Sequence, residues 1–151
     1  MSLLFILAML SGVVADDFEV PPDMAFDTTT VIGQFIGFEV GAQVQPVIRD
    51  RNGELVSFWS AGPLMDYFLC IHLNERVTLE VEEVDTYIAS IGEVSRVWRI
   101  IEASAGALSF STWRDSLEAR GEPEELLGDY FSAPLDHTVG GTVGDSNSGE
   151  R

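Results

Sequence analysis

Residues 31–59, VIGQFIGFEVGAQVQPVIRDRNGELVSFW, decide the fold because they predict three β-strands in succession. Apolar and polar residues alternate over residues 31–40, which is typical of a half-buried strand. A second strand is expected over residues 43–50 and a third over residues 54–59. The rest of the chain is interpreted as being built around this β-rich stretch.

Glycine and proline mark the irregular points of these strands. Period-two alternation along the first strand puts four of its apolar side chains on one face, namely Ile32, Ile36, Phe38 and Val40. Gly33 and Gly37 fall on the other face, where glycine permits a sharp bend or a close backbone approach. Pro46 has no N–H to donate, so we expect the second strand to lie at an edge or to carry a bulge.

The segment Asp50-Arg51-Asn52-Gly53 predicts a hairpin turn with two physical solutions. Asn52 and Gly53 can form a two-residue type I′ loop. Alternatively, Asp50 opens a type I turn and Gly53 takes the left-handed position of a G1 bulge. The two solutions differ by one residue in register, and both give Gly53 a positive φ.

A helix and a long strand are predicted after the break at residues 61–63. Residues 64–74 carry apolar side chains at helical spacing, which predicts a short, mostly buried helix, with a further strand as the alternative because the segment is short. Residues 76–88 alternate as a strand does. The phase of the alternation slips at Glu82 and Glu83, which is typical of a β-bulge.

Residues 92–103 predict a returning strand with apolar residues on both faces. Its Arg96 and Arg99 are expected to form cross-strand pairs with Glu80, Glu82 or Glu83. After Gly106 the pattern becomes helical.

The boundaries of this last helix are read from its caps. Thr112 and Asp115 form a variant of the capping box at its start. Gly121 followed by Pro123 is expected to end it.

The composition predicts one domain with flanking segments. A chain of 151 residues that is 46% hydrophobic is long and apolar enough for a single ordinary core. We expect a leader at residues 1–15, an extended segment at 16–30, a β-rich domain with a C-terminal helix at 31–132 and a disordered tail at 133–151. Three apolar residues are expected to attach the extended segment to the domain: Phe18, Val20 and Phe26.

The charge is strongly negative. The chain has 25 acidic and 8 basic residues, all of them arginine, for a formal net charge of −17. Such a field repels phosphate backbones and anionic membrane surfaces, so nucleic acid is not expected as a partner. The acidity is explained either by a heavily solvated surface or by life in high salt.

The N-terminus predicts export. Residues 2–15, SLLFILAMLSGVVA, are uncharged and are followed by Asp16 and Asp17. This run is shorter than the ~20 residues of a membrane-spanning helix but suits the core of a signal peptide. Val13 and Ala15 are placed as a cleavage site requires, although no basic residue precedes the run. The alternatives are an uncleaved leader that retains the protein at a membrane, and a buried N-terminal helix or strand. After cleavage no stable membrane span is expected.

The usual catalytic and metal-binding motifs are absent from the sequence. It contains no nucleophile elbow, phosphate-binding loop, HExxH or CxxC. Cys70 is the lone cysteine and is interpreted as a small buried hydrophobe. His72 is interpreted as a hydrogen-bonded structural residue. No catalytic residue, metal ligand or cofactor is predicted.

Aromatic and arginine side chains are the candidate ligand-binding residues. Aromatic rings on a sheet stack on sugars or on apolar peptide groups. The proposed ligand-binding residues are Trp59, Tyr67, Tyr87, Trp98, Arg96 and Arg99.

The predicted order β-β-β-α-β-β, with bend glycines in the first strand, resembles the OB-fold over residues 31–103. The resemblance implies a mainly β fold, a five-stranded Greek-key barrel with the C-terminal helix appended. OB-fold proteins bind oligonucleotides or oligosaccharides on the barrel face, and the charge of this chain departs from the nucleic-acid pattern.

Two classes of function fit the sequence. The first is an exported, non-catalytic module that binds a protein or a saccharide. The second is a small carboxylate-dependent hydrolase or carbohydrate-active enzyme. An exposed patch of aromatic residues and arginine on the sheet would favour the first, and a cleft of carboxyl groups with raised pKa would favour the second. A third reading, a cytosolic subunit whose first 15 residues pack on a partner, depends on the leader.

Overall fold

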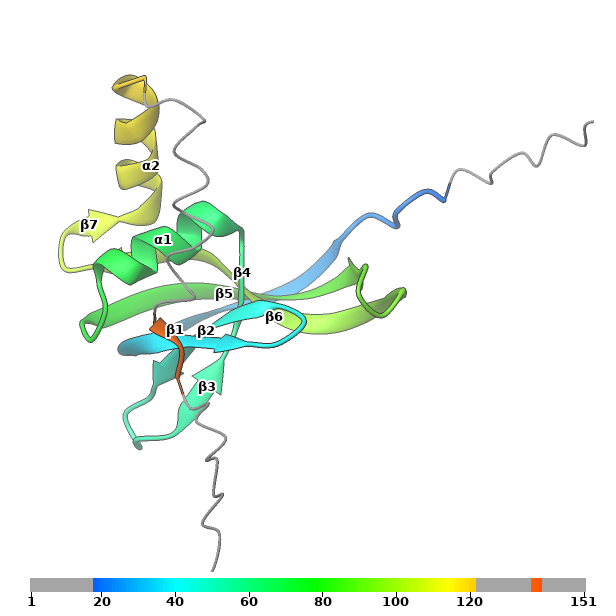
Figure 1. Ribbon diagram of the computed structural model, residues 1–151, viewed down its shortest axis with the longest axis horizontal. Helices are drawn as coiled ribbons and strands as arrows, with labels where there is room; N and C mark the ends of the chain where they lie inside the picture. The colour runs from blue at the N-terminus through cyan, green and yellow to red at the C-terminus, as the bar shows by residue number, and fades with distance from the viewer. Residues whose placement is uncertain (1–17, 122–136, 140–151) are drawn as a thin grey trace, which may run out of the picture.

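The computed structural model describes residues 18–121 and 137–139, which form a mainly β structure with two helices (Figure 1). The predicted leader, and all of the predicted tail except residues 137–139, lie outside the described residues. The strands are β1 (Met24–Val40), β2 (Val44–Arg49), β3 (Leu55–Ser57), β4 (Trp59–Ser60), β5 (Arg76–Ile88), β6 (Glu93–Ala105) and β7 (Leu108–Ser109), and the helices are α1 (Pro63–Ile71) and α2 (Phe110–Ala119). Among the described residues, no helix is both long enough and apolar enough to cross a bilayer.

The strands form one sheet in the order β3-β2-β1-β5-β6-β4, with β7 paired to β6. Neighbouring strands are antiparallel, except that β4 runs parallel to β6, with Trp59 opposite Arg99. Only Phe58 separates β3 from β4. The extended segment 55–60 therefore supplies both outermost strands of the order, β3 next to β2 and β4 next to β6.

The hairpin between β2 and β3 adopts the second of its two predicted solutions. The N–H of Gly53 donates to the carbonyl of Asp50 at 3.1 Å, as in a type I turn, and Gly53 has a φ of 81°. The Asp50 carboxylate accepts the N–H groups of Asn52 and Glu54 at 2.8 and 2.9 Å. This side chain therefore selects the turn, because it satisfies two backbone donors that the loop leaves unpaired.

Strand β1 begins at Met24, seven residues before the predicted start. Residues 24–34 pair with β5, and residues 34–40 pair with β2. This part of the strand was not predicted because residues 27–30 are polar. Their side chains are exposed on both faces and show no alternation of apolar and polar residues. The segment predicted to be extended is thus in part a strand of the sheet.

The predicted buried face of β1 was wrong. The register of β1 with β2 shifts between Phe35 and Gly37, and this bulge turns Phe35 and Phe38 to the same side. Both rings are fully buried, while Ile36 is only partly buried and Val40 is exposed. A strict period-two reading fails wherever a strand contains an extra residue.

The two glycines of β1 are sites of close approach, as predicted. A Cβ on Gly33 would collide with the side chain of Ile48 and the carbonyl of Arg49. Gly37 has a φ of 138°, and a Cβ there would collide with the carbonyl of His137. Residues 137–139 run beside β1 at this point, where the N–H of Val139 donates to the Phe38 carbonyl at 2.7 Å.

Strand β5 has the predicted bounds. The bulge predicted at Glu82 and Glu83 is not in β5, and the extra residues lie in the neighbouring strands β1 and β6. The register shifts on β1 between Ala25 and Thr28, and on β6 next to Ile101. Because β5 itself is regular, its buried residues change from one face of the sheet to the other. The main core takes Val77, Leu79 and Val81, and a second, smaller cluster takes Val84 and Ile88.

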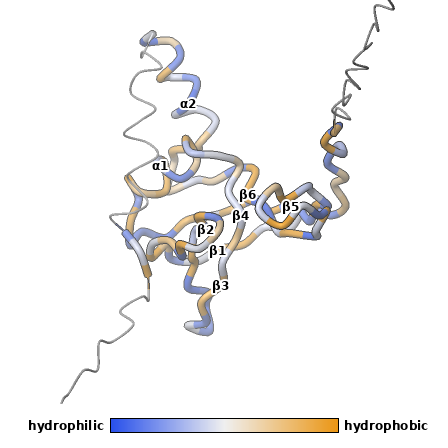
Figure 2. Tube along the Cα trace, turned by 45° about the vertical axis from the view of Figure 1, so that its right-hand side comes forward, coloured by the Kyte–Doolittle hydropathy of each residue, from blue (hydrophilic) through white to orange (hydrophobic). Residues whose placement is uncertain are grey.

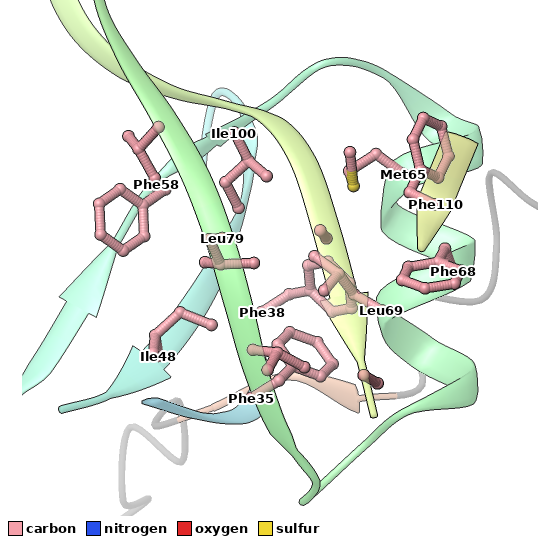
Figure 3. Packing of buried hydrophobic residues seen from close by; sticks show 14 residues of the cluster. Phe35, Phe38, Ile48, Phe58, Met65, Phe68, Leu69, Leu79, Ile100 and Phe110 are labelled. Carbon is pink, nitrogen blue, oxygen red and sulfur yellow. The ribbon is translucent and has the colours of Figure 1, made fainter. Parts of the chain in front are cut away.

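The main core lies between the sheet and helix α1 (Figure 3). Pro63 starts this helix, where a missing N–H costs nothing, and the apolar spacing predicted for residues 64–74 turns one side toward the sheet. Each fully buried large apolar side chain contributes on the order of 1.5–3 kcal/mol. The fully buried residues include Phe35, Phe38, Ile48, Phe68, Leu69, Leu79 and Ile100.

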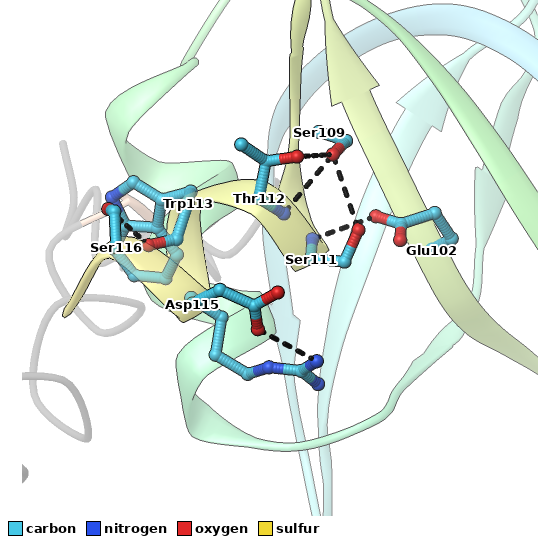
Figure 4. Close-up of polar contacts among 8 residues, drawn as sticks. Glu102, Ser109, Ser111, Thr112, Trp113, Asp115 and Ser116 are labelled. Carbon is cyan, nitrogen blue, oxygen red and sulfur yellow. Dashed lines mark hydrogen bonds and ion pairs between the residues drawn. The ribbon is translucent and has the colours of Figure 1, made fainter. Parts of the chain in front are cut away.

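Helix α2 begins earlier than predicted. Its N-cap is Ser109, whose hydroxyl accepts the N–H of Thr112 at 3.2 Å, so the predicted capping role of Thr112 was wrong (Figure 4). The Glu102 carboxylate accepts the N–H of Ser111 at 3.2 Å and places a negative charge at the helix N-terminus. The helix ends before Gly121, which has a φ of 61°, as the sequence predicted.

Candidate functional site

One end of the sheet extends beyond the two helices. We call this end the arm and define it as residues 24–30 of β1, 82–88 of β5 and 93–99 of β6. Figure 1 shows the arm pointing away from α1 and α2, and Figure 2 shows hydrophobic segments on it as well as on the rest of the chain. An apolar surface at this end of the sheet is covered by neither helix.

The register of β5 with β6 fixes which side chains of the arm share a face. Residues directly opposite one another in antiparallel strands project to the same side. The pairs on one face are Glu83 with Trp98, Asp85 with Arg96 and Tyr87 with Val94. Two residues from the N-terminal part of the chain join this face, because Phe26 contacts Arg96 and Phe18 contacts Tyr87. We call the group Phe18, Phe26, Tyr87, Val94, Arg96 and Trp98 the aromatic face.

The aromatic face continues the main core beyond the helices. Val81 and Ile100 are opposite one another and fully buried in that core. Two residues further along each strand, Glu83 faces Trp98 on the same side of the sheet, and Trp98 is 42% exposed. Phe26 and Val94 are 46% and 48% exposed. The same face of the sheet is therefore buried at Val81 and Ile100 and exposed to solvent on the arm.

Arg96 is held at the centre of this face by three neighbours. Its guanidinium lies 4.0 Å from the centroid of the Phe26 ring. It donates two hydrogen bonds to the two carboxylate oxygens of Asp85, at 2.8 and 3.1 Å, and Glu83 lies 3.6 Å away. Hydrogen bonding from Arg96 lowers the pKa of Asp85 below its ordinary value. The guanidinium is thus oriented before any ligand arrives.

Arg99 lies on the opposite face of the arm and is also paired. It donates to Glu82 at 2.6 Å and to Asp23 at 2.7 Å. The Asp23 carboxylate also accepts the hydroxyl of Thr86 at 2.6 Å, and this bond together with that from Arg99 lowers its pKa. These contacts tie the segment before β1 to β5 and β6. The predicted cross-strand pairing of both arginines with glutamates is confirmed.

Trp59 lies on the same face as Arg99. It packs against the second cluster, which consists of Val84, Ile88 and Val97. Its other side lines a hollow of about 280 Å³ between residues 39–45 and residues 88–91. A partly buried indole beside an open hollow of this kind is suited to stacking on a flat ligand.

Tyr67 is separated from the other predicted ligand-binding residues. It lies on α1 and stacks on Trp113 of α2, with the ring centroids 6.1 Å apart. The structure therefore gathers Tyr87, Arg96 and Trp98 on one face of the arm, and Trp59 and Arg99 on the other.

The sequence interpretation missed the acidic and aromatic partners of the arginines. Asp23 and Asp85 were not recognised as their ion-pair partners, and Phe26 was expected only to attach the extended segment to the domain. A signal did exist, because Asp85 lies opposite Arg96 once a hairpin is closed around the turn at residues 89–92. No sequence pattern reports the pairing of β1 with β5, which brings in Asp23 and Phe26.

Two titratable side chains of the α1 region, His72 and Asp66, are partly or fully buried. His72 has the predicted structural role, since its Nδ1 lies 2.8 Å from the Glu75 carboxylate and its ring contacts Phe68. Asp66 is only 8% exposed, and burial raises its pKa to about 6, opposed by a hydrogen bond with Ser60. Within residues 18–121 and 137–139, no three His, Cys, Asp or Glu side chains gather as a metal site would require.

Comparison of this chain with protein-family models, with curated proteins and with solved structures finds no match. Its functional interpretation therefore rests on the geometry described above.

Proposed function

We propose that this protein is an exported, non-catalytic binding module whose ligand docks on the aromatic face of the arm. The scaffold that we infer is a five-stranded OB-like barrel. Support for the barrel comes from residues 55–60, which pair with both β2 and β6 and so join the two ends of the strand order. Export is supported by the uncharged residues 2–15.

The observation that carries the proposal is the exposure of Trp98 and Phe26 around an oriented Arg96. Tryptophan, tyrosine and arginine are the residues that contribute most binding energy at protein interfaces. An apolar face left open on a sheet is also costly to a soluble chain unless a partner covers it. Both facts favour a protein ligand with an apolar surface.

A saccharide is the second candidate ligand, and the hollow beside Trp59 favours it. The hollow is bordered by the loops that follow β1 and β5. In OB-fold proteins these two loops flank the ligand-binding face. Titration with a panel of neutral oligosaccharides, followed by tryptophan fluorescence and repeated with Trp59→Ala, tests this candidate separately.

An enzymatic function has less support. A carboxylate-dependent hydrolase needs two carboxyl groups on one accessible cleft. Asp66 has the raised pKa that an acid catalyst requires, but it is only 8% exposed. The rise in its pKa is explained by desolvation.

The proposal is tested by photo-crosslinking in an extract of the native source. A photoreactive phenylalanine replaces Val94 on the aromatic face, and a control protein carries it at Glu118, which is exposed on α2. We expect an adduct of discrete mass from position 94 and none from position 118. Absence of an adduct, or identical adducts from both positions, would show that the aromatic face binds no specific partner.

A further inference from the structure

Three arginines gather at a hollow on the sheet, away from the aromatic face. The hollow has a volume of about 480 Å³, and Arg49, Arg51 and Arg76 line it together with Gln34 and Asp50. Arg49 and Arg76 are the partners of Gln34 on its two sides, so the three side chains form a row across β2, β1 and β5. Adjacent strands are about 4.8 Å apart, which places the two arginines about 10 Å from each other with Gln34 between them.

Among the residues that the structure describes, these arginines have no ion-pair partner, although the chain is rich in carboxylates. The side chains of Arg96, Arg99 and Arg114 all form ion pairs with acidic residues. Within the described part of the chain, none of the three arginines at the hollow has such a partner. The nearby Asp50 carboxylate is occupied by the backbone N–H groups of its own turn. Three guanidinium groups against the single carboxylate of Asp50 give the lining of the hollow a net positive charge, opposite to that of the whole protein.

An open strand edge leads into this hollow. Strand β2 leaves β1 at Arg49, opposite Gln34. Among residues 18–121 and 137–139, residues 24–33 of β1 therefore have β5 on one side and no strand on the other. The backbone groups of Phe35 point toward β5, since its N–H donates to Glu75 and its carbonyl accepts from Asn74. Alternation along the strand then turns the N–H and carbonyl groups of Ile32 and Thr30 to the open side.

The open edge carries few of the features that prevent strand addition. Edge strands are normally protected by lysine, proline, charged side chains or bulges. Residues 28–33, TTTVIG, contain no charge and no proline, and the nearest bulge lies before Thr28. A strand laid along this edge would continue the line of β2 and would end beside Arg49.

We propose that the hollow binds the terminal carboxylate of an extended polypeptide that pairs with the open edge of β1. The peptide runs parallel to β1, since only this direction brings its C-terminus to Arg49 and Arg76. Its main chain bonds to Ile32 and Thr30, and its carboxylate accepts hydrogen bonds from the guanidinium groups. Because the protein carries a net charge of −17, the side chains that precede the terminus are neutral or basic. The inference goes beyond the proposed function, since this site shares no residue with the aromatic face.

The test uses the full chain and a library of random octapeptides tethered through their N-termini. Each peptide is presented once with a free C-terminal carboxylate and once as the amide. We expect a subset of sequences to retain the protein at least tenfold better as carboxylates than as amides. The double variant Arg49→Gln/Arg76→Gln should lose at least tenfold in binding, whereas Arg114→Gln on α2 should bind as the wild type does.

A second measurement reports on the strand edge without any substitution. Hydrogen exchange at the amides of Thr30 and Ile32 should slow when a retained peptide is added, because those groups become hydrogen-bonded. Equal retention of carboxylates and amides would overturn the inference, as would unchanged exchange at these two amides. If inorganic phosphate alone binds and perturbs Arg49 and Arg76 while no peptide is retained, the hollow is a site for free anions and the inference is wrong. A specific adduct at position 94 in any of these cases would leave the proposed function standing.

Discussion

The guanidinium of Arg96 lies over the ring of Phe26, 4.0 Å from its centroid, although the two residues are 70 positions apart in the chain. The contact exists because β1 pairs with β5 from Met24 onward and carries Phe26 to the arm. Arg96 is also held by two hydrogen bonds to Asp85. An arginine held between a ring and a carboxylate loses little conformational freedom on binding, which lowers the entropic cost of docking a partner.

The hairpin turn gives a prediction about stability. Gly53 has a φ of 81°, and no neighbour lies within 4 Å of the place that a Cβ would occupy, so backbone conformation alone decides the effect of a substitution. Gly53→Val should destabilise the fold by roughly 1–3 kcal/mol in chemical denaturation, because a β-branched residue rarely adopts a positive φ. Gly41→Ala, at a loop glycine with an ordinary φ and equally open surroundings, is the matched control and should be close to neutral. Equal effects of the two substitutions would contradict the turn assignment.

The raised pKa of Asp66 gives a prediction about pH. The native state keeps a proton on this carboxyl up to about pH 6, while the unfolded chain releases it near pH 3.8. The stability that this proton contributes is fully present below pH 3.8 and is lost as the pH rises through 6. Asp66→Asn should therefore stabilise the protein at pH 7.5, by up to about 3 kcal/mol, and should have little effect near pH 3.5.

Chemical denaturation of both proteins across this pH range measures the difference. Glu118→Gln, which removes the charge of an exposed carboxyl on α2, serves as the control for the loss of one negative charge. A gain for Asp66→Asn that is the same at every pH would show that the carboxyl is not protonated in the folded state.

Much of the fold follows from the sequence alone because local patterns specify it. The bounds of β5 were predicted from alternation, α1 from helical spacing and the turn from Asp50 and Gly53. Alternation does not predict the buried face of a strand that contains a bulge. In β1, an extra residue near Gly37 changes which aromatic rings are buried. The start of β1 was missed because its exposed threonines gain order only by pairing with a distant strand.

The candidate site could be predicted only in part for the same reason. Trp98, Tyr87 and Arg96 were candidates from the sequence by residue type, and the register of β5 with β6 places them on one face. Phe26 reaches them through long-range pairing, and the hollow at Arg49 and Arg76 exists only where three strands meet. Neither contact leaves a periodic signal in the sequence.

Nucleic acid should not bind, despite the arginines of the arm. Arg96 and Arg99 are each neutralised by two carboxylates, and the surrounding chain is strongly acidic. A gel-shift assay with single-stranded oligothymidylate at low salt should show no complex, where an electrostatic contact would be strongest. A salt-sensitive complex that disappears in the Arg96→Ala/Arg99→Ala double variant would contradict this prediction.

The predicted export signal can be checked on the native protein. Mature protein purified from its source should begin near Asp16, because cleavage is expected after Ala15. Mass spectrometry of the intact chain and of its N-terminal peptide measures this directly. A soluble cytosolic form that still begins at Met1 would show that residues 2–15 are not a cleaved leader.

Competition for the crosslinked partner tests the central claim, docking on the aromatic face, most directly. The protein with the photoreactive group at position 94 is irradiated in the native extract with an excess of unlabelled competitor. Wild-type protein should abolish the adduct, and so should Leu108→Ala, a control at an exposed apolar residue near α2. The Phe26→Ala/Trp98→Ala double variant should compete at least tenfold less well while remaining folded by circular dichroism. If that variant competes as well as the wild type does, the partner does not dock on the aromatic face and the account is wrong.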